Sequence, residues 1–280
     1  MKRLILILLL MCILCGCGSG PEPSEPAVLT DTEPVPTQPV TEEGLISLQP
    51  QNPQTETVPP AAGDRIPGEV SYSILERDDS IRNENGDVLV SIRYQQVILD
   101  DSRPEWEAIN TLIESSYQAF REETAYLSET TPEEWEQILG EMGAVYGNFM
   151  ANISARVTHN AGGILSLRMH RDWFMGGVYN GDPFALNFDL TTGERLPLSR
   201  LSDLPEAEFE AQLKQIVCRD LEAYRDTLFD DPAVILQDFA LEDFSYCIEE
   251  GELILLFSTY TFGPGVMGST EVRTGLYPML

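Results

Sequence analysis

Basic charge is scarce in this chain of 280 residues, which has 17 Lys and Arg against 46 Asp and Glu and a formal net charge of −29. Its only lysines are Lys2 and Lys214, and the arginines are interspersed among carboxylates. Binding to nucleic acid needs clustered Lys and Arg that neutralise phosphates, so we exclude nucleic acid as a partner. Tight attachment to an anionic surface is excluded for the same reason. The charge favours a basic partner, and the alternative is that it keeps an exported protein soluble.

Histidine is also scarce, with only His159 and His170. No HxxE, HExxH, Cys-His cluster or Gly-x-Ser-x-Gly motif is present, so we predict no catalytic residues, no metal and no cofactor. The two histidines fall on opposite arms of one expected hairpin, where a metal pair is an alternative to exposed or hydrogen-bonded side chains. Carboxylates that could serve glycoside hydrolysis are too abundant to form a signal; they include Asp182, Asp189, Glu249 and Glu250.

Long apolar runs are absent except for residues 4–14, which follow Lys2 and Arg3. This arrangement is typical of a secretory signal and is shorter than the roughly 20 residues of a membrane-spanning helix. Leu14-Cys15-Gly16-Cys17 resembles the lipobox of bacterial lipoproteins. The resemblance implies a signal peptide over 1–16 and a diacylglycerol thioether with palmitate-type chains on Cys17. It would anchor the protein on the extracytoplasmic side of the cell membrane; the alternative is a short uncleaved anchor.

Apolar periodicity is missing from residues 17–67, which hold 11 of the 19 prolines. Such a segment cannot bury enough surface to offset its ordering entropy, so we predict a disordered tether between the lipidated Cys17 and the folded domain. A proline-rich ligand for a recognition domain is the alternative.

Residues 68–280 are long enough for one domain with a hydrophobic core. Helical spacing of apolar residues begins near Ser102, at Thr131 and after Asp203, and the third helix is expected to bury Leu213, Val217, Leu221, Tyr224 and Leu228. Strand-like patterns occupy the remaining segments: 70–76, 88–99, 153–157, 164–169, 184–190, 244–248, 252–262 and 272–277. This order predicts an α+β domain with a mostly antiparallel sheet and two or three packed helices.

Cysteine is nearly absent from this domain, where only Cys218 and Cys247 occur. Outside the cytoplasm an even pair is a candidate disulfide, which would close a loop of about 30 residues. The alternative is two small buried thiols.

Several motifs resemble the extracytoplasmic domain that RsiV-type anti-sigma factors share with PdaC-type peptidoglycan deacetylases. They are Gly176-Gly177-Val178-Tyr179, the segment 187–196 that ends in Thr-Thr-Gly-Glu-Arg-Leu, and the hairpin and glycine loop of 252–268. The resemblance covers about 70–280 and implies a non-catalytic module that contacts cell-wall material or a wall-degrading enzyme, lysozyme in the RsiV-type proteins. The family often has His where this chain has Tyr179, so no role of that His is carried over. We expect this chain to contain only the extracytoplasmic binding domain of those proteins, without a sigma-binding segment or a deacetylase domain.

Aromatic residues beside glycine-rich loops are the best candidates for a contact surface. The predicted ligand-binding residues are Trp173, Tyr179, Tyr260, Phe262, Gly263, Gly265 and Gly268. For Trp173 and Phe174, filling the core is an equal alternative. The predicted function is a lipid-anchored binding or sensor protein for peptidoglycan or a basic wall hydrolase; the alternatives are an envelope enzyme acting on peptidoglycan and a structural lipoprotein.

Overall fold

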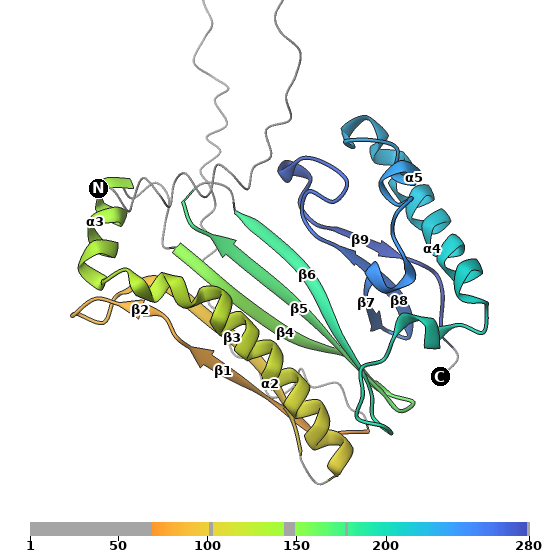
Figure 1. Ribbon diagram of the computed structural model, residues 1–280, viewed down its shortest axis with the longest axis horizontal. Helices are drawn as coiled ribbons and strands as arrows, with labels where there is room; N and C mark the ends of the chain where they lie inside the picture. Colours follow the sequence, from red (N-terminus) through yellow and green to blue (C-terminus); the bar gives the residue numbers. More distant parts are fainter. Residues whose placement is uncertain (1–68, 101–102, 143–148, 177–178, 279–280) are drawn as a thin grey trace, which may run out of the picture. The chain divides into compact units, whose positions relative to one another are not determined.

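The computed structural model describes residues 69–100, 103–142, 149–176 and 179–278 (Figure 1). These residues belong to one compact unit of the chain, Asn52–Leu280. The signal peptide, Cys17 and the tether predicted for 1–67 lie outside the described residues. No helix among the described residues is long and apolar enough to cross a membrane.

The larger sheet, sheet A, has six strands in the order β1-β3-β4-β5-β6, with the short β2 also paired to β3. Its strands are β1 (Tyr72–Asp78), β2 (Ile81–Arg82), β3 (Val88–Leu99), β4 (Phe149–Ala161), β5 (Ile164–Phe174) and β6 (Asn180–Asp189). All pairs are antiparallel except β3 with β4, because the chain between those two strands crosses over through helices. The α+β fold class is confirmed, and this parallel pair makes the sheet mixed.

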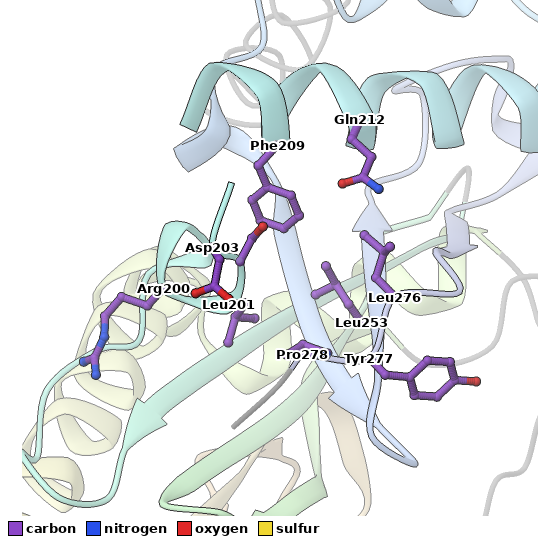
Figure 2. A pocket seen from close by; sticks show the side chains of 10 residues that line it. Arg200, Leu201, Asp203, Phe209, Gln212, Leu253, Leu276, Tyr277 and Pro278 are labelled. Carbon is purple, nitrogen blue, oxygen red and sulfur yellow. The ribbon is translucent and has the colours of Figure 1, made fainter. Parts of the chain in front are cut away.

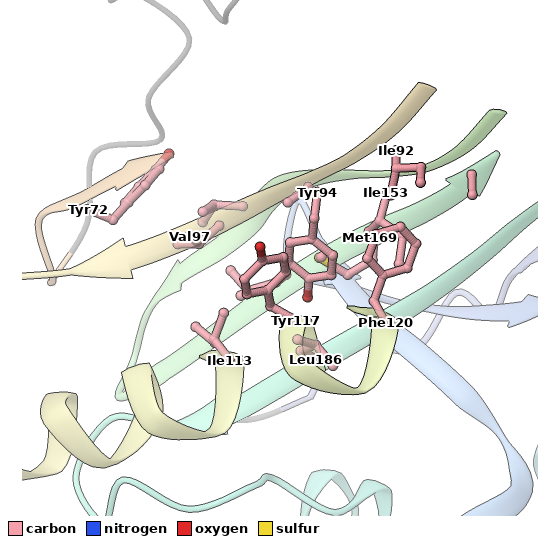
Figure 3. Close-up of a cluster of buried hydrophobic side chains, with 14 of the residues drawn as sticks. Tyr72, Ile92, Tyr94, Val97, Ile113, Tyr117, Phe120, Ile153, Met169 and Leu186 are labelled. Carbon is pink, nitrogen blue, oxygen red and sulfur yellow. The ribbon is translucent and has the colours of Figure 1, made fainter. Parts of the chain in front are cut away.

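Two helices in that crossover cover one face of sheet A: α2 (Pro104–Thr124) and α3 (Pro132–Met142). The predicted start of α3 is confirmed as a capping box, since Thr131 Oγ1 accepts from the Glu134 amide and the Glu134 carboxylate accepts from the Thr131 amide. The described residue that precedes α2 is Arg103, which makes no side-chain cap. Figure 3 shows the core beneath α2, where the rings of Tyr94 and Tyr117 lie 5.3 Å apart.

A separate antiparallel sheet, sheet B, has the order β7-β8-β9. Its strands are β7 (Ser245–Glu249), β8 (Glu252–Phe257) and β9 (Thr270–Arg273). The helix α4 (Glu206–Leu221) packs on one face of sheet B and forms a second core, and the short α5 (Pro232–Ile235) lies against α4. Short 3-10 helices connect these elements: η1 (Ala125–Glu129), η2 (Leu198–Leu201), η3 (Glu222–Thr227), η4 (Leu241–Asp243) and η5 (Gly265–Met267).

Three of the predicted elements are shorter in the structure or end earlier. The strand expected over 272–277 ends at Arg273. The strand expected over 252–262 ends at Phe257, because the following turn places Tyr260 at φ 69°. The third helix changes to 3-10 geometry after Leu221, and this change leaves Tyr224 54% exposed. The prediction that Tyr224 lies on the buried face of that helix is therefore wrong.

Sheet B contacts the face of sheet A opposite to α2 through a buried polar group. Ser166 and Asn187 are neighbours on β5 and β6. Asn187 Nδ2 donates to the carbonyl of Tyr246 at 2.6 Å, and Ser166 Oγ accepts from the Ile248 amide at 3.0 Å. These two side chains supply hydrogen-bond partners for the backbone groups at the outer edge of β7, where a buried N–H or C=O without a partner would destabilise the fold.

Candidate functional site

The described part of the domain has at least two recesses on its surface. The first, which we call the Phe209 recess, has a volume of about 200 Å³ and lies between α4, η2 and β8 (Figure 2). Its apolar wall consists of Leu201, Phe209, Leu253 and Leu276. None of the predicted ligand-binding residues lines this recess.

The second recess has a volume of about 300 Å³, and we call it the His170 recess. It lies between sheet A and the loop that joins β8 to β9. Three predicted residues line it, namely Tyr179, Gly265 and Gly268, and the rest of its wall consists of His170, Gly181, Thr259, Val266, Met267 and Ser269. Residues separated by about 90 positions in the sequence are thus brought together at one place on the surface.

The β8–β9 loop is held on sheet A by Asp182. Asp182 Oδ1 accepts a hydrogen bond from the Thr259 amide at 2.7 Å, and Thr259 Oγ1 donates to the Gly181 carbonyl at 3.2 Å. Gly265 then allows the loop to fold back on Tyr260, since a Cβ at that position would lie 2.5 Å from the Tyr260 hydroxyl. The loop is therefore fixed at both the strand and the ring, which gives the recess a preformed wall.

Gly181 leaves space for the ring of His170. A Cβ on Gly181 would lie 3.0 Å from His170 Nε2 and 3.4 Å from Tyr179 Cε1. A side chain at position 181 would therefore crowd the ring of His170.

His170, Asp172 and Tyr179 form a hydrogen-bonded group at the wall of the recess. Asp172 Oδ1 accepts from the Tyr179 hydroxyl and lies 3.3 Å from His170 Nε2. The hydrogen bond to Asp172 raises the pKa of His170 above its ordinary value. Burial acts to raise the pKa of Asp172, but the hydrogen bonds from His170 and Tyr179 outweigh it and keep that pKa low. Burial and the same carboxylate raise the pKa of Tyr179.

Arg168 lies on the same face of β5 as His170, two residues earlier, because side chains alternate along a strand. Its guanidinium bonds Glu271, with Arg168 Nη1 at 2.9 Å from Glu271 Oε2, and lies 3.7 Å from Glu249. Glu249 also accepts from Arg156 at 2.8 Å. Arg168 is thus paired with carboxylates, and its remaining positive charge opposes a proton on His170 less strongly than Asp172 favours one.

The remaining predicted ligand-binding residues have different positions. Tyr260 is 48% exposed at the edge of the β8–β9 loop. Gly263 is covered by Met267 and the Thr227 carbonyl. Trp173 is partly buried against the core of sheet A, which was the alternative for this residue. Phe262 is only 1% exposed, with its ring 4.8 Å from that of Phe257, so its role as a surface anchor is corrected to a core residue.

Cys218 and Cys247 are both free in the structure, which favours the alternative of two separate thiols over the candidate disulfide. Cys218 packs with the α4 core on one face of sheet B, whereas Cys247 packs with Ile254, Leu256 and Ala185 on the other face. Consecutive residues of a strand point to opposite faces, and β7 itself separates the two thiols. Burial raises the pKa of Cys247 to about 11.

The two histidines do not meet. His170 pairs with Ser154, and His159 pairs with Ser166 after an irregularity in the β4–β5 register. Among the described residues, no group of three or more His, Cys, Asp or Glu is arranged to hold a metal ion.

The sequence analysis did not identify Asp172, named Asp182 only among the many carboxylates, and gave His170 no ligand-binding role. The available signal was the run of polar residues at alternate positions, Ser166, Arg168, His170 and Asp172, which alternates with the apolar Leu165, Leu167 and Met169 over the first part of the strand. Such a run indicates a polar face of the strand that borders a site or solvent.

No family model and no curated protein matches the sequence. Six solved chains resemble the structure. One is a member of the DUF3298 family from Bacteroides fragilis, with a TM-score of 0.53, 15% identity and coverage of 74% of this chain and 90% of that one. Another is a DUF3298 family protein from Pseudomonas aeruginosa, with a TM-score of 0.45, 15% identity and coverage of 76% and 92%. The first similarity shows a shared fold.

Proposed function

We propose that residues 68–280 form an extracytoplasmic binding module that captures a basic, cell-wall-associated protein, with a lysozyme-like hydrolase as the first candidate. The module would be held at the membrane by a lipid on Cys17 and raised from it by the tether of residues 17–67. The binding surface would be the rim of the His170 recess.

The observation that carries this proposal is the set of exposed apolar side chains around the recess. Val266 is 95% exposed, and Tyr179 and Tyr260 are 47% and 48% exposed. Large apolar groups on a rigid, water-accessible loop are typical of interaction sites, and Tyr is enriched among the residues that dominate binding energy. Because Asp182 and Gly265 already fix this loop, little ordering cost would be left for binding.

Charge indicates the kind of partner. Residues 68–280 carry 14 Lys and Arg against 38 Asp and Glu, a net charge of −24. Such a field attracts a basic protein and increases its association rate, and salt reduces this effect over a Debye length of about 10 Å at 0.1 M. The apolar rim would supply the part of the affinity that survives salt.

Surface plasmon resonance of the detergent-solubilised full chain against a basic lysozyme, at low and high salt, tests the proposal. We expect a fast, salt-sensitive association rate and a residual affinity at high salt. Tyr179→Ala should weaken the residual affinity by about 2 kcal/mol, roughly thirtyfold. The matched control is Tyr126→Ala on η1, where the tyrosine is 45% exposed and remote from the recess in sequence.

Each other outcome removes a different part of the proposal. If no lysozyme binds at low salt, this hydrolase is not the ligand. Binding that disappears completely at moderate salt would mean charge attraction without a specific site. Equal effects of the two tyrosine substitutions would place the site away from the His170 recess.

A further inference from the structure

The inference below rests on the proposed function, because it concerns the ligand chemistry and the regulation of the same recess. It begins from the groups that face His170. From β5 these are Asp172 and Arg168; from β6, Asp182; and from the segment before β6, Tyr179. The cross-strand neighbour on β4 is the uncharged Ser154. The β8–β9 loop contributes no charged residue between Ser258 and Ser269.

The balance of these charges depends on one proton. Arg168 is engaged by Glu271 and Glu249, and the carboxylate beside the imidazole is that of Asp172, whose Oδ1 lies 3.3 Å from His170 Nε2. Asp182 adds a weaker negative field from β6. When His170 is protonated, its charge partly compensates these two carboxylates. When His170 is neutral, the wall of the recess carries uncompensated negative charge next to the ring of Tyr179.

The shape of the recess suits one long side chain. Its volume is about 300 Å³, and its walls are ring surfaces, glycine backbone and the side chain of Met267. Arginine and lysine place an apolar stem against such walls and keep the cation near a carboxylate or an aromatic face.

We propose that the His170 recess takes a single arginine or lysine side chain of the basic partner, and that this cation and the proton on His170 exclude each other. Binding of the cation then releases a proton from His170. By reciprocity, protonation of His170 weakens binding by the same factor. Because the hydrogen bond with Asp172 raises the pKa of His170, this weakening begins above the ordinary imidazole value of about 6.5.

The decisive experiment uses the full chain in detergent with isotopically labelled histidine. The chain has only two histidines, so His159 serves as an internal control for the NMR titration of His170. The probes are the peptides acetyl-Gly-Arg-Gly-amide and acetyl-Gly-Gln-Gly-amide. We expect the arginine peptide at saturation to lower the pKa of His170 by about one unit, equivalent to tenfold in affinity, and to leave His159 unchanged. The glutamine peptide should change neither.

A second arm measures affinity for the basic lysozyme between about pH 8 and about pH 5.5. Wild type and the control His159→Gln should bind about tenfold more weakly at the lower pH. His170→Gln, which carries no titrating proton, should lose this dependence.

The two arms separate the two proposals. If the arginine peptide leaves the pKa of His170 unchanged, or shifts both histidines equally, the cation site is refuted even when lysozyme binds. If the peptide lowers the pKa of His170 but lysozyme does not bind, the cation site is supported and lysozyme is refuted as the partner.

Discussion

Asp189 was named among the carboxylates that could serve glycoside hydrolysis, but its side chain stabilises a turn instead. Its Oδ1 accepts from the Thr191 amide at 2.8 Å and from the Thr191 hydroxyl, and its Oδ2 accepts from Arg200 Nη1 at 2.7 Å. These bonds, with the one from the Thr191 hydroxyl foremost, lower the pKa of Asp189 to about 2. The carboxylate is buried and fully engaged, so it is not available as a glycosidase group.

We predict that Asp189→Asn destabilises the domain near neutral pH by on the order of 1–2 kcal/mol. The pKa is lower in the folded state than in the unfolded state, so this stabilisation is present above about pH 4 and is lost as the pH falls toward 2. Urea unfolding at about pH 7 and about pH 3 should therefore show a clear difference from wild type at the first pH and a reduced one at the second. The exposed Asp238→Asn is the control, and an equal loss at both pH values would contradict the linkage.

At the scale of elements, the hydrogen bonds from sheet A to the edge of β7 join the two sheets. Asn187→Ala removes the donor to the buried Tyr246 carbonyl, and we expect a loss of about 1–3 kcal/mol in the free energy of unfolding. Urea denaturation measures it. Gln137→Ala, on the exposed face of α3, should change the midpoint little. An unchanged midpoint for Asn187→Ala would mean that the carbonyl is satisfied in another way.

Periodicity was sufficient to find most elements because each element has one buried face. The hairpin of β4 and β5, the strand β3 and the helix α2 all follow alternation or helical spacing of apolar residues. The parallel pairing of β3 with β4 and the division into two sheets were not predicted, since pairing between distant segments leaves no local pattern. The left-handed backbone of Tyr260 was also not predicted, because a positive φ is expected from sequence mainly at glycine and position 260 is a tyrosine.

Part of the candidate site could be predicted from local sequence motifs. Glycines next to aromatics in 176–179 and 260–268 identified two of its segments, and Tyr179, Gly265 and Gly268 do line one recess. Phe262 could not be separated from Tyr260 by sequence alone, because both lie in the same turn and only the backbone direction decides which ring is buried. Asp172 acquires its role through contacts with His170 on the same strand and with Tyr179 in the segment before β6.

At the scale of the whole molecule, anchoring is the prediction that decides where the domain acts. Cys17→Ser should abolish labelling by a clickable palmitate analogue and leave a precursor or a released form, because the thioether needs the Cys17 sulfur. Membrane fractionation with gel fluorescence measures this. Cys15→Ser is the matched control and should keep the label, since it spares the residue that follows Gly16. A Cys17→Ser chain that is still labelled would refute the anchoring site.

The edge of β7 also has a consequence for how the chain assembles. Ser166 and Asn187, which terminate that edge, belong to a different sheet and precede β7 by about 60 to 80 residues. Until β5 and β6 have paired, the Tyr246 carbonyl and the Ile248 amide have no internal partner from sheet A, and β7 and β8 together form an apolar hairpin with an open edge. An open apolar edge is a template for pairing with another chain. Aggregation during folding should therefore depend on how quickly sheet A forms, and substitutions at Ser166 or Asn187 should lower the yield of folded protein by more than their effect on equilibrium stability.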